Sequence, residues 1–398
     1  MKIIDIRKYC KEEFELITVH NNRIYYCKAD NLQNENEYLV DFYYYDIENK
    51  IENKITNTSI YTSEFYGKKI YTYDKYIMFS IINKDDIQIF KLDMNTNKVD
   101  KVSEFKVDKK YYNGISFLGD TYLILYIDKS DVDDEKFNRA KDVQGGYESA
   151  YLYDIYNGQK YEILDKRVIL GVRDYLEYYT YNGQGFLIFE EAYMEDWEQQ
   201  ELYHENLDKT DYYRESYRES INIISLNEFV EGIENRNIMI SFHQVHKTEV
   251  QGWTRYFGMD ETNIYYRTKN FKTNVESICC VNKNNLKQEK LGEIHFDKLK
   301  DNNIRYDIKK QKIYNKHYDE NKIHIYGIYN SDTEISFEKS IGEFYDIIDN
   351  KYLITYYWEE DDQDNYYDYM VIKNLMSSEE KLYQGMCCVV DDLVIMYK

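Results

Sequence analysis

The sequence predicts an all-β protein built from repeated four-stranded antiparallel sheets. The chain has 398 residues, of which 47 are Tyr, 17 Phe and 3 Trp, and aromatic side chains favour strands. It contains no Pro and only 16 Gly, so its tight turns have to be made by Asn and Asp, which tolerate positive φ. Two kinds of strand motif alternate along the chain, repeating every roughly 40–80 residues. This combination predicts a single β-propeller.

The first motif is a polar turn followed by roughly four to six apolar or aromatic residues. In one copy Ile77, Met78, Phe79 and Ile81 run nearly together, where a half-exposed strand would alternate between apolar and polar residues. Strands covered on both faces have such runs, so we expect these to be inner strands. The motif begins at Asn21, Asp74, Asp120, Gly183, Glu261, Asn350 and Asp391.

The second motif is a strand, an Asn or Asp turn and a return strand. It is more polar and alternates better, as half-exposed outer strands do. An inner pair followed by an outer pair makes one four-stranded antiparallel blade. Clear copies of these predicted outer hairpins begin at Asp86, Ser149, Ser220, Glu276 and Tyr367.

The blade count depends on a weaker unit and on the chain ends. The stretch 303–330 repeats the pattern faintly, and with it the chain holds seven blades. A strand pair from about Met386 to Lys398 is then left over, while the N-terminal strand Ile3 to Arg7 has no hairpin mate. Pairing the two ends closes the ring, buries both edges and makes eight blades. Seven blades is the alternative count, and a pair of stacked β-sandwiches is the alternative fold.

We expect one domain over residues 1–398, with insertions at about 129–146, 191–218 and 358–366. In a propeller the loops between second and third strands share one rim with the connections between blades. All three insertions fall on this rim, which we call the upper face.

The blade sequences LYDIYNGQKYEIL and IFKLDMNTNKVDKVSE carry a resemblance to a known superfamily. Both have a strand ending in Asp, a polar turn and a return strand. They resemble the blades of TolB-like and prolyl-oligopeptidase-type β-propellers. The resemblance covers most of the chain and implies a ligand-binding upper rim. The blades leave no room for the hydrolase domain that oligopeptidases append, and the signature motifs of kelch, WD and sialidase propellers are absent.

The net charge narrows the choice of partners. With 51 Lys and Arg against 73 Asp and Glu, the net charge is −22 and the pI is near 4.9. This excludes nucleic acid and anionic membranes as favoured partners, since both are polyanions. A basic or neutral protein, peptide or small molecule is the expected partner.

The sequence also bears on localisation. No apolar stretch approaches the roughly 18 residues of a membrane span, and the charged start does not resemble a signal peptide. We therefore expect a cytoplasmic protein.

The candidate ligand-binding residues combine tryptophans with carboxylates. Aromatic ring faces attract positive charge and C–H groups, and carboxylates accept hydrogen bonds. The other interpretation is that each Trp covers the end of its own blade beside solvated acidic loops. The candidates on the upper face are Trp197, Trp253, Trp358, Glu190, Glu191, Glu359, Glu360 and Asp361.

We predict a non-catalytic binding protein that uses this acidic, aromatic upper face. The alternative is a carbohydrate-active hydrolase or lyase that works through two carboxylates of the same face. We predict no catalytic residue, because adjacent carboxylates arise by chance among 73 acidic residues.

No cofactor or metal ion is predicted. Calcium is the alternative at two acidic runs, 131–135 and 361–364, although neither has the Gly of an EF-hand loop. His243 and His246 are three apart on a predicted strand, a spacing that does not bring both to one ion. The six cysteines include no CxxC and are expected to be reduced core residues.

Overall fold

A computed structural model describes residues 1–10, 13–32, 37–55, 60–62, 70–83, 86–108, 112–128, 148–165, 168, 176–194, 217–248, 252–270, 273, 275–295, 304–307, 312–317, 322–327, 332–336, 342–349, 351–361, 363 and 365–397. The chain divides into two compact units. Unit 1 comprises Met1–Glu104, Tyr318–Ile323 and Ile335–Lys398, and unit 2 comprises Phe105–His317 and His324–Glu334.

Unit 1 contains four sheets, each built from strands that neighbour one another in the sequence, apart from the sheet that joins the chain ends. Its strands are β2 (Glu13–His20), β3 (Arg23–Leu32), β4 (Glu37–Asp46), β5 (Ile51–Lys54) and β6 (Ile60–Thr62); β7 (Ile70–Tyr73), β8 (Tyr76–Asn83), β9 (Asp86–Asp93) and β10 (Lys98–Lys106); β27 (Glu343–Ile348), β28 (Tyr352–Glu360), β29 (Tyr366–Asn374) and β30 (Glu380–Gln384); and β1 (Lys2–Asp5), β31 (Met386–Val390) and β32 (Leu393–Tyr397).

Three four-stranded sheets lie in unit 2, and a fourth lies mostly in it. Their strands are β11 (Tyr112–Leu118), β12 (Tyr122–Asp128), β13 (Glu148–Asp154) and β14 (Lys160–Glu162); β15 (Leu176–Tyr181), β16 (Gln184–Met194), β17 (Tyr217–Ser225) and β18 (His243–Lys247); β19 (Gly252–Met259), β20 (Asn263–Asn270), β21 (Val275–Asn282) and β22 (Gln288–His295); and β23 (Ile304–Asp307), β24 (Lys312–His317), β25 (Lys322–Gly327) and β26 (Asp332–Ser336).

The predicted fold class is confirmed. Within the described residues there are eight sheets, and six of them have four strands hydrogen-bonded in sequence order. The weak unit from Asn303 is one of these six, as the blade count required. The series of meandering antiparallel sheets is that of a β-propeller, and the predicted inner strands are the second strands of their sheets.

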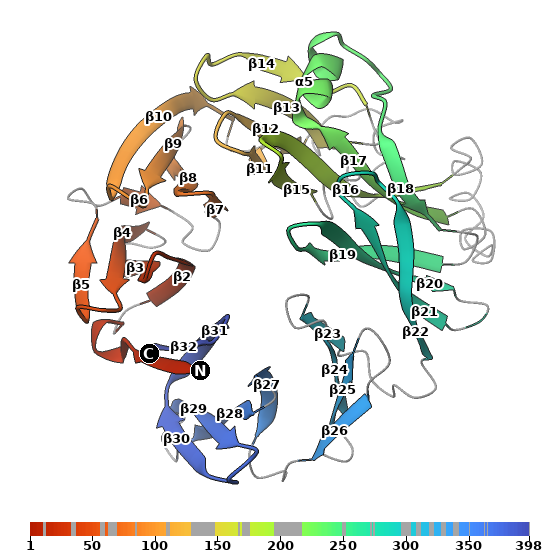
Figure 1. Cartoon of the computed structure of the whole chain (residues 1–398). Helices are drawn as coiled ribbons and strands as arrows, with labels where there is room; N and C mark the ends of the chain where they lie inside the picture. Colours follow the sequence, from red (N-terminus) through yellow and green to blue (C-terminus); the bar gives the residue numbers. More distant parts are fainter. Residues whose placement is uncertain are drawn as a thin grey trace. The chain divides into compact units, whose positions relative to one another are not determined.

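The two chain ends pair, as predicted, but in a sheet of three strands rather than four. The order is β1-β32-β31, and β1 runs parallel to β32, with Lys2 opposite Leu393 and Asp5 opposite Met396 (Figure 1). Another departure from four strands is β6, which pairs with β4 beside β5.

Continuous apolar runs form the cores between sheets. Ile77, Met78 and Phe79 are fully buried, which confirms the inner-strand interpretation of β8. Phe79 stacks on Phe42 of the β2–β6 sheet, with ring centroids 4.3 Å apart. Burial of each such side chain stabilises the fold by about 1.5–3 kcal/mol.

Asn and Asp make the turns, as the absence of Pro and the scarcity of Gly required. Asn22, Asp74, Asn182 and Asp391 have φ between 49° and 58°, a region in which short polar side chains are the usual non-glycine residues. At the turns from third to fourth strands, a carboxylate or amide oxygen accepts two backbone N–H groups two and three residues on. The residues with this role are Asp46, Asp93, Asp154, Asn282 and Asn374.

The outer hairpin predicted from Ser220 is wrong. After β17 the chain forms a helix, α5 (Leu226–Glu234), and returns to the sheet only at β18. Ser225 is the N-cap residue: its hydroxyl oxygen accepts the Glu228 backbone N–H at 3.2 Å, and the same hydroxyl donates to the Glu228 carboxylate at 2.6 Å. The apolar residues Phe229, Val230 and Ile233 then bury one face of the helix.

All six cysteines are free thiols and most are buried. Burial raises the pKa of both Cys387 and Cys388 to about 12, so these thiols stay protonated and weakly nucleophilic at neutral pH. In the part of the chain that the structure describes, no helix has the length and apolar character needed to cross a membrane.

Candidate functional site

The predicted site residues fall in both units. Trp358, Glu359 and Glu360 end β28 in unit 1, and Asp361 follows them. Glu190 on β16 and Trp253 on β19 belong to unit 2. Trp197 lies outside the described residues, as does the side chain of Glu191, whose backbone is part of β16. Each described candidate lies in, or next to, the half of its strand nearest the predicted upper rim.

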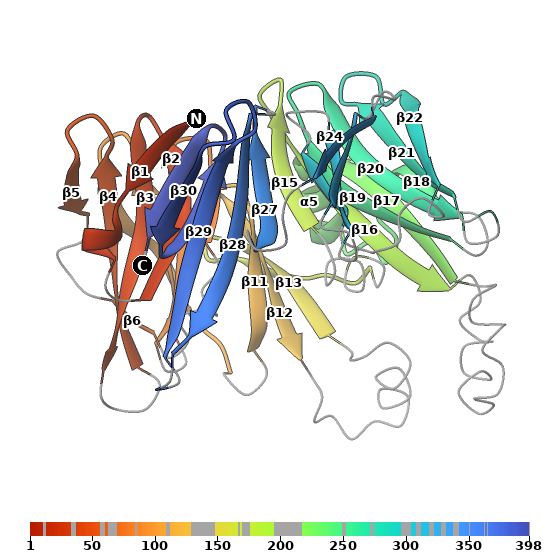
Figure 2. The same ribbon diagram turned by 90° about the horizontal axis from the view of Figure 1, so that it is seen from below.

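The β28–β29 hairpin is longer than the sheet that packs against it. Both strands have nine residues, whereas β31 and β32 have five and β1 has four. Met370 of β29 packs with Val394 and Met396 of β32 in a buried cluster. Beyond Met370 the long strands β28 and β29 (Figure 2) continue on the same face with two further cross-strand pairs, Trp358–Asp368 and Glu360–Tyr366.

Aromatic and acidic side chains alternate on this part of the hairpin face. Trp358 is paired with Asp368 across the two strands, and Glu360 with Tyr366. Residues that are paired, or two apart on a strand, share a face, so these four form one surface, which we call the aromatic–acidic surface. Trp358 is 58% exposed and Tyr366 is 64% exposed. Their ring centroids lie 5.5 Å apart at an angle of 57°.

Glu359 belongs to the opposite face of the hairpin, where it is paired with Tyr367. Adjacent strand residues point to opposite sides of a sheet. Glu359 and Glu360 therefore do not face the same ligand, and adjacency in the sequence gives no catalytic carboxylate pair here.

Asp361 organises the turn of the hairpin. Its Oδ1 accepts the backbone N–H groups of Gln363 at 2.9 Å and Asn365 at 3.0 Å, and its Oδ2 accepts the Tyr367 hydroxyl at 3.1 Å. The Asn365 side chain also donates to this carboxylate. These bonds, led by the Asn365 side chain, lower the pKa of Asp361 to about 2, so the carboxylate stays ionised and shapes the turn.

Because this pKa lies below the ordinary value of 3.8, the bonds of Asp361 contribute to stability in full above about pH 4. That contribution is lost as the pH falls through about 2. We expect the Asp361 carboxyl, followed by NMR, to titrate near pH 2, with the Gln363 and Asn365 amide signals moving at the same midpoint. A midpoint near 3.8 would contradict the turn geometry.

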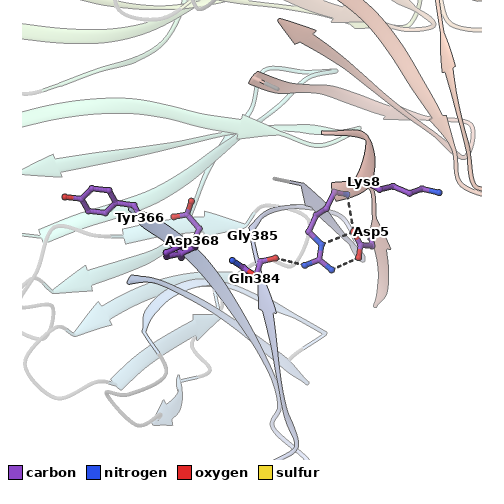
Figure 3. A pocket seen from close by; sticks show the side chains of 8 residues that line it. Asp5, Lys8, Tyr366, Asp368, Gln384 and Gly385 are labelled. Carbon is purple, nitrogen blue, oxygen red and sulfur yellow. Dashed lines mark hydrogen bonds and ion pairs between the residues drawn. The ribbon is translucent and has the colours of Figure 1, made fainter. Parts of the chain in front are cut away.

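A pocket of about 680 Å³ adjoins the aromatic–acidic surface (Figure 3). One side is lined by Tyr366, Tyr367 and Asp368 of β29, and the other by Asp5 and the residues after β1. Gln384 and Gly385 complete it.

The guanidinium of Arg7, which lines this pocket, already forms hydrogen bonds within the chain. Arg7 lies in the 3-10 helix η1 (Arg7–Tyr9). Its guanidinium donates to both oxygens of Asp5, at 3.0 and 2.6 Å, and to the Gln384 carbonyl at 2.6 Å. The bond to Asp5 raises the pKa of Arg7 and lowers that of Asp5. The Lys8 side chain extends away from Asp368 (Figure 3) and lies over the Tyr9 ring. Within the described residues, Asp368 is therefore the carboxylate of this pocket that forms no salt bridge with Arg7 or Lys8.

Glu190, the candidate on β16, holds two sheets together with Glu219 of β17, which was not predicted. Glu190 is buried and accepts the backbone N–H of Tyr256, and Glu219 is buried and accepts that of Thr254 at 2.7 Å. Both carboxylates also face one nitrogen of Arg255, at 3.7 and 2.7 Å. These two carboxylates belong to the neighbouring β15–β18 sheet, and they accept backbone N–H groups on the edge of β19 that does not face β20.

Trp253 is half-buried, and its ring is covered by Arg267 of the adjacent strand, 4.8 Å from the centroid. Arg267 in turn pairs with the buried Glu276 at 3.3 Å. This arrangement matches the interpretation in which a Trp covers its own blade. Trp253 differs in this respect from Trp358, whose face is exposed.

A second pocket, of about 410 Å³, lies in unit 2 between β18 and the β19–β22 sheet. His246 of the predicted HxxH lines it, with Nε2 3.2 Å from the Thr268 hydroxyl. Within the described residues, no three His, Cys, Asp or Glu side chains are grouped closely enough to hold a metal ion. Asp131, Asp133, Glu135, Asp362 and Asp364 of the calcium alternative lie outside those residues.

The sequence analysis did not identify several residues of the site. Tyr366 and Asp368 carry no motif of their own, but a hairpin centred on residue 363 places them opposite Glu360 and Trp358. The Glu219–Arg255 pair has no sequence signal, because packing joins two residues that lie 36 apart in the sequence. The Asp5–Arg7 pair is local, with its partners two positions apart in the sequence, but nothing in the sequence indicates that it lines a pocket.

No protein-family model matches the chain, and no curated protein matches it. Several solved structures are similar. An oligogalacturonate lyase in complex with manganese is 10% identical, with 94% of this chain and 95% of that chain covered and a TM-score of 0.41. The β-propeller domain of the Trilobed protease from Pyrococcus furiosus is 12% identical, with 94% and 93% covered and a TM-score of 0.43. TolB from Acinetobacter baumannii is 14% identical, with 77% and 61% covered and a TM-score of 0.33.

These likenesses concern the fold alone. The chain has a β-propeller fold. The predicted β-propeller fold is confirmed by the series of antiparallel sheets described above.

Proposed function

We propose that the chain is a non-catalytic binding protein that takes a cationic side chain of a peptide or protein partner on the aromatic–acidic surface of β28 and β29. The observation that carries this proposal is the exposed pair of Trp358 and Tyr366, interleaved with Glu360 and Asp368 on one strand face. An aromatic face attracts a cation electrostatically, and the adjacent carboxylates supply charge-assisted hydrogen bonds.

The surroundings of this surface support a basic partner. The net charge of −22 draws cations to the protein, and Arg7 and Lys8 do not offset Asp368, since Arg7 is paired with Asp5 and Lys8 points away. Exposed aromatic residues beside a pocket are also typical anchor points of protein interfaces. A cytoplasmic location, expected from the sequence, is part of the same proposal.

The alternative, a carbohydrate-active hydrolase or lyase, needs two carboxylates that face a cleft. The buried pair, Glu190 and Glu219, instead accepts backbone N–H groups of β19. Neither residue is among those that line the two pockets described above. Asp5 and Asp368 do line one pocket, but both carboxylate oxygens of Asp5 accept hydrogen bonds from Arg7, so among the described lining residues Asp368 lacks a second carboxylate free to act with it. We therefore rank the enzyme second.

The proposal is tested with the peptide Ac-Thr-Arg-Val-Arg-Thr-amide and its citrulline counterpart, which keeps the shape and lacks the charge. We expect the arginine peptide to bind and the citrulline peptide to bind at least tenfold more weakly in isothermal titration calorimetry. Binding should weaken as salt is raised. Equal affinity for the two peptides, or no binding of either, would overturn the proposal.

Replacement of the exposed ring separates binding from folding. A stacking aromatic contributes about 1 kcal/mol beyond its area, so Trp358→Ala should weaken the arginine peptide roughly five- to tenfold. Because Trp358 is 58% exposed, the melting temperature should change little. Tyr156→Ala, at a 53% exposed aromatic of unit 2, is the matched control and should leave the affinity unchanged. A large loss of stability with unchanged affinity in Trp358→Ala would mean that the ring only covers its blade.

A further inference from the structure

The sheet that joins the chain ends has one strand fewer than a complete blade. Its order, β1-β32-β31, leaves β1 at the outer edge, and within the described residues no strand pairs with that edge. The other seven sheets have at least four strands each among the described residues. The position of a fourth strand is thus open in this sheet.

The hydrogen bonds of β1 show which of its backbone groups point outward. The N–H groups of Lys2 and Ile6 donate to Asp392 and Met396, at 2.8 and 3.0 Å. In a ladder, alternate residues bond to the same neighbour, so the even-numbered residues of β1 face β32. The N–H and C=O groups of Ile3 and Asp5 therefore point to the open edge.

The open edge leads into the candidate site. Asp5 is the last residue of β1 and lines the same pocket as Tyr366 and Asp368. Arg7 joins the two sides by its bond to the Gln384 carbonyl. A strand laid along β1 would therefore run directly to the pocket and to the carboxylate of Asp368 (Figure 3).

We propose that an extended, basic segment of the partner adds to β1 as the missing strand and delivers a cationic side chain to the pocket beside Asp368 and Tyr366. This inference rests on the proposed function. In such strand addition, main-chain hydrogen bonds supply affinity and the pocket supplies specificity. The basic character follows from the net charge and from the aromatic–acidic surface at the end of the edge. Exposed edges are otherwise avoided in folded proteins.

Amide hydrogen exchange on the full chain tests the inference with the same probe, Ac-Thr-Arg-Val-Arg-Thr-amide. At saturating peptide we expect exchange of the Ile3 and Asp5 amides to slow at least tenfold, while the Ile6 amide, already bonded to Met396, changes little. The indole signal of Trp358 reports binding to the aromatic–acidic surface in the same sample.

N-methylation of the peptide at alternate residues is the second test, because a methylated backbone nitrogen cannot donate a hydrogen bond to β1. Of the two peptides, one methylated at its odd-numbered and one at its even-numbered residues, one should bind at least tenfold more weakly and the other should keep its affinity.

The outcomes separate this inference from the function on which it rests. If the Trp358 signal responds but the Ile3 and Asp5 amides do not slow, strand addition is wrong and the cation-binding function stands. If these amides are already slow in the free protein, the edge is covered and strand addition is again wrong. If no signal responds to the peptide, both proposals fail.

Discussion

Removal of the last eight residues, from Asp391 onward, should leave a protein that is unfolded or aggregated. The deletion takes away β32, whose Val394, Ile395 and Met396 are fully buried. Each contributes about 1.5–3 kcal/mol by burial, and their sum is comparable with the whole stability of a typical domain, about 5–15 kcal/mol. Because β32 lies between β1 and β31 in the sheet, its loss also leaves both of these strands without their hydrogen-bonding partner.

The measurement is the soluble yield and the thermal unfolding curve of the truncated chain. Two milder changes serve as controls. Deletion of Lys398 alone should have no effect, and Met396→Leu, which conserves volume, should cost less than about 1.5 kcal/mol. Ile395→Ala should lie between these and the truncation, at about 2–5 kcal/mol. A truncated protein that stays soluble and melts at the parent temperature would show that β32 does not hold the chain ends together.

The strands and turns were predictable from the sequence because their causes are local. An apolar run such as Ile77 to Phe79 is compatible only with burial on both faces, and Asn or Asp at a tight turn fulfils a backbone requirement. The pairing of the chain ends followed from a different kind of inference. A leftover C-terminal pair and an N-terminal strand without a hairpin mate both had open edges, and β1 and β32 pair with each other.

The direction of β1 and the helix after β17 were not predicted, for different reasons. No local signal distinguishes a parallel from an antiparallel edge strand of four residues. The helix did carry a signal, the N-cap residue Ser225 with Glu228 three residues later, but the strand-turn-strand pattern of the neighbouring repeats obscured it. The repeated strand-turn-strand pattern therefore led to the wrong prediction of a hairpin from Ser220.

The candidate site was only half predictable. Trp358 and Glu360 stand out as an aromatic and an acid at the end of an inner strand, whereas Tyr366 and Asp368 join them through hairpin register. That register depends on the turn made by Asp361. The exposure of the whole surface depends on a length difference between β28 and the strands of another sheet. Such a difference is invisible until the sheets are paired.

The carboxylate of Glu219 holds two sheets of unit 2 together, and its removal should strongly destabilise the fold. Glu219 is 2% exposed. It accepts the Thr254 backbone N–H and the Arg255 guanidinium, both at 2.7 Å. In the sequence it resembles any other of the 73 acidic residues, because only the fold places it beside β19.

Glu219→Ala leaves the N–H of Thr254 buried without its acceptor, which costs about 1–3 kcal/mol. Of the two carboxylates that face Arg255, only that of Glu190, at 3.7 Å, then remains. Removal of one partner of a buried ion pair costs about 3–5 kcal/mol, and this figure is reduced here because the Arg255 side chain is 41% exposed. We therefore expect a loss of about 2–4 kcal/mol in the free energy of unfolding, measured by urea denaturation.

The matched control is Glu289→Ala, at an exposed glutamate of β22, which should change stability by no more than about 0.5 kcal/mol. A double-mutant cycle with Arg255→Ala separates the two roles of Glu219. If the coupling energy is small while Glu219→Ala remains costly, the bond to the β19 edge dominates. If Glu219→Ala is no more damaging than Glu289→Ala, the buried carboxylate does not hold the sheets together.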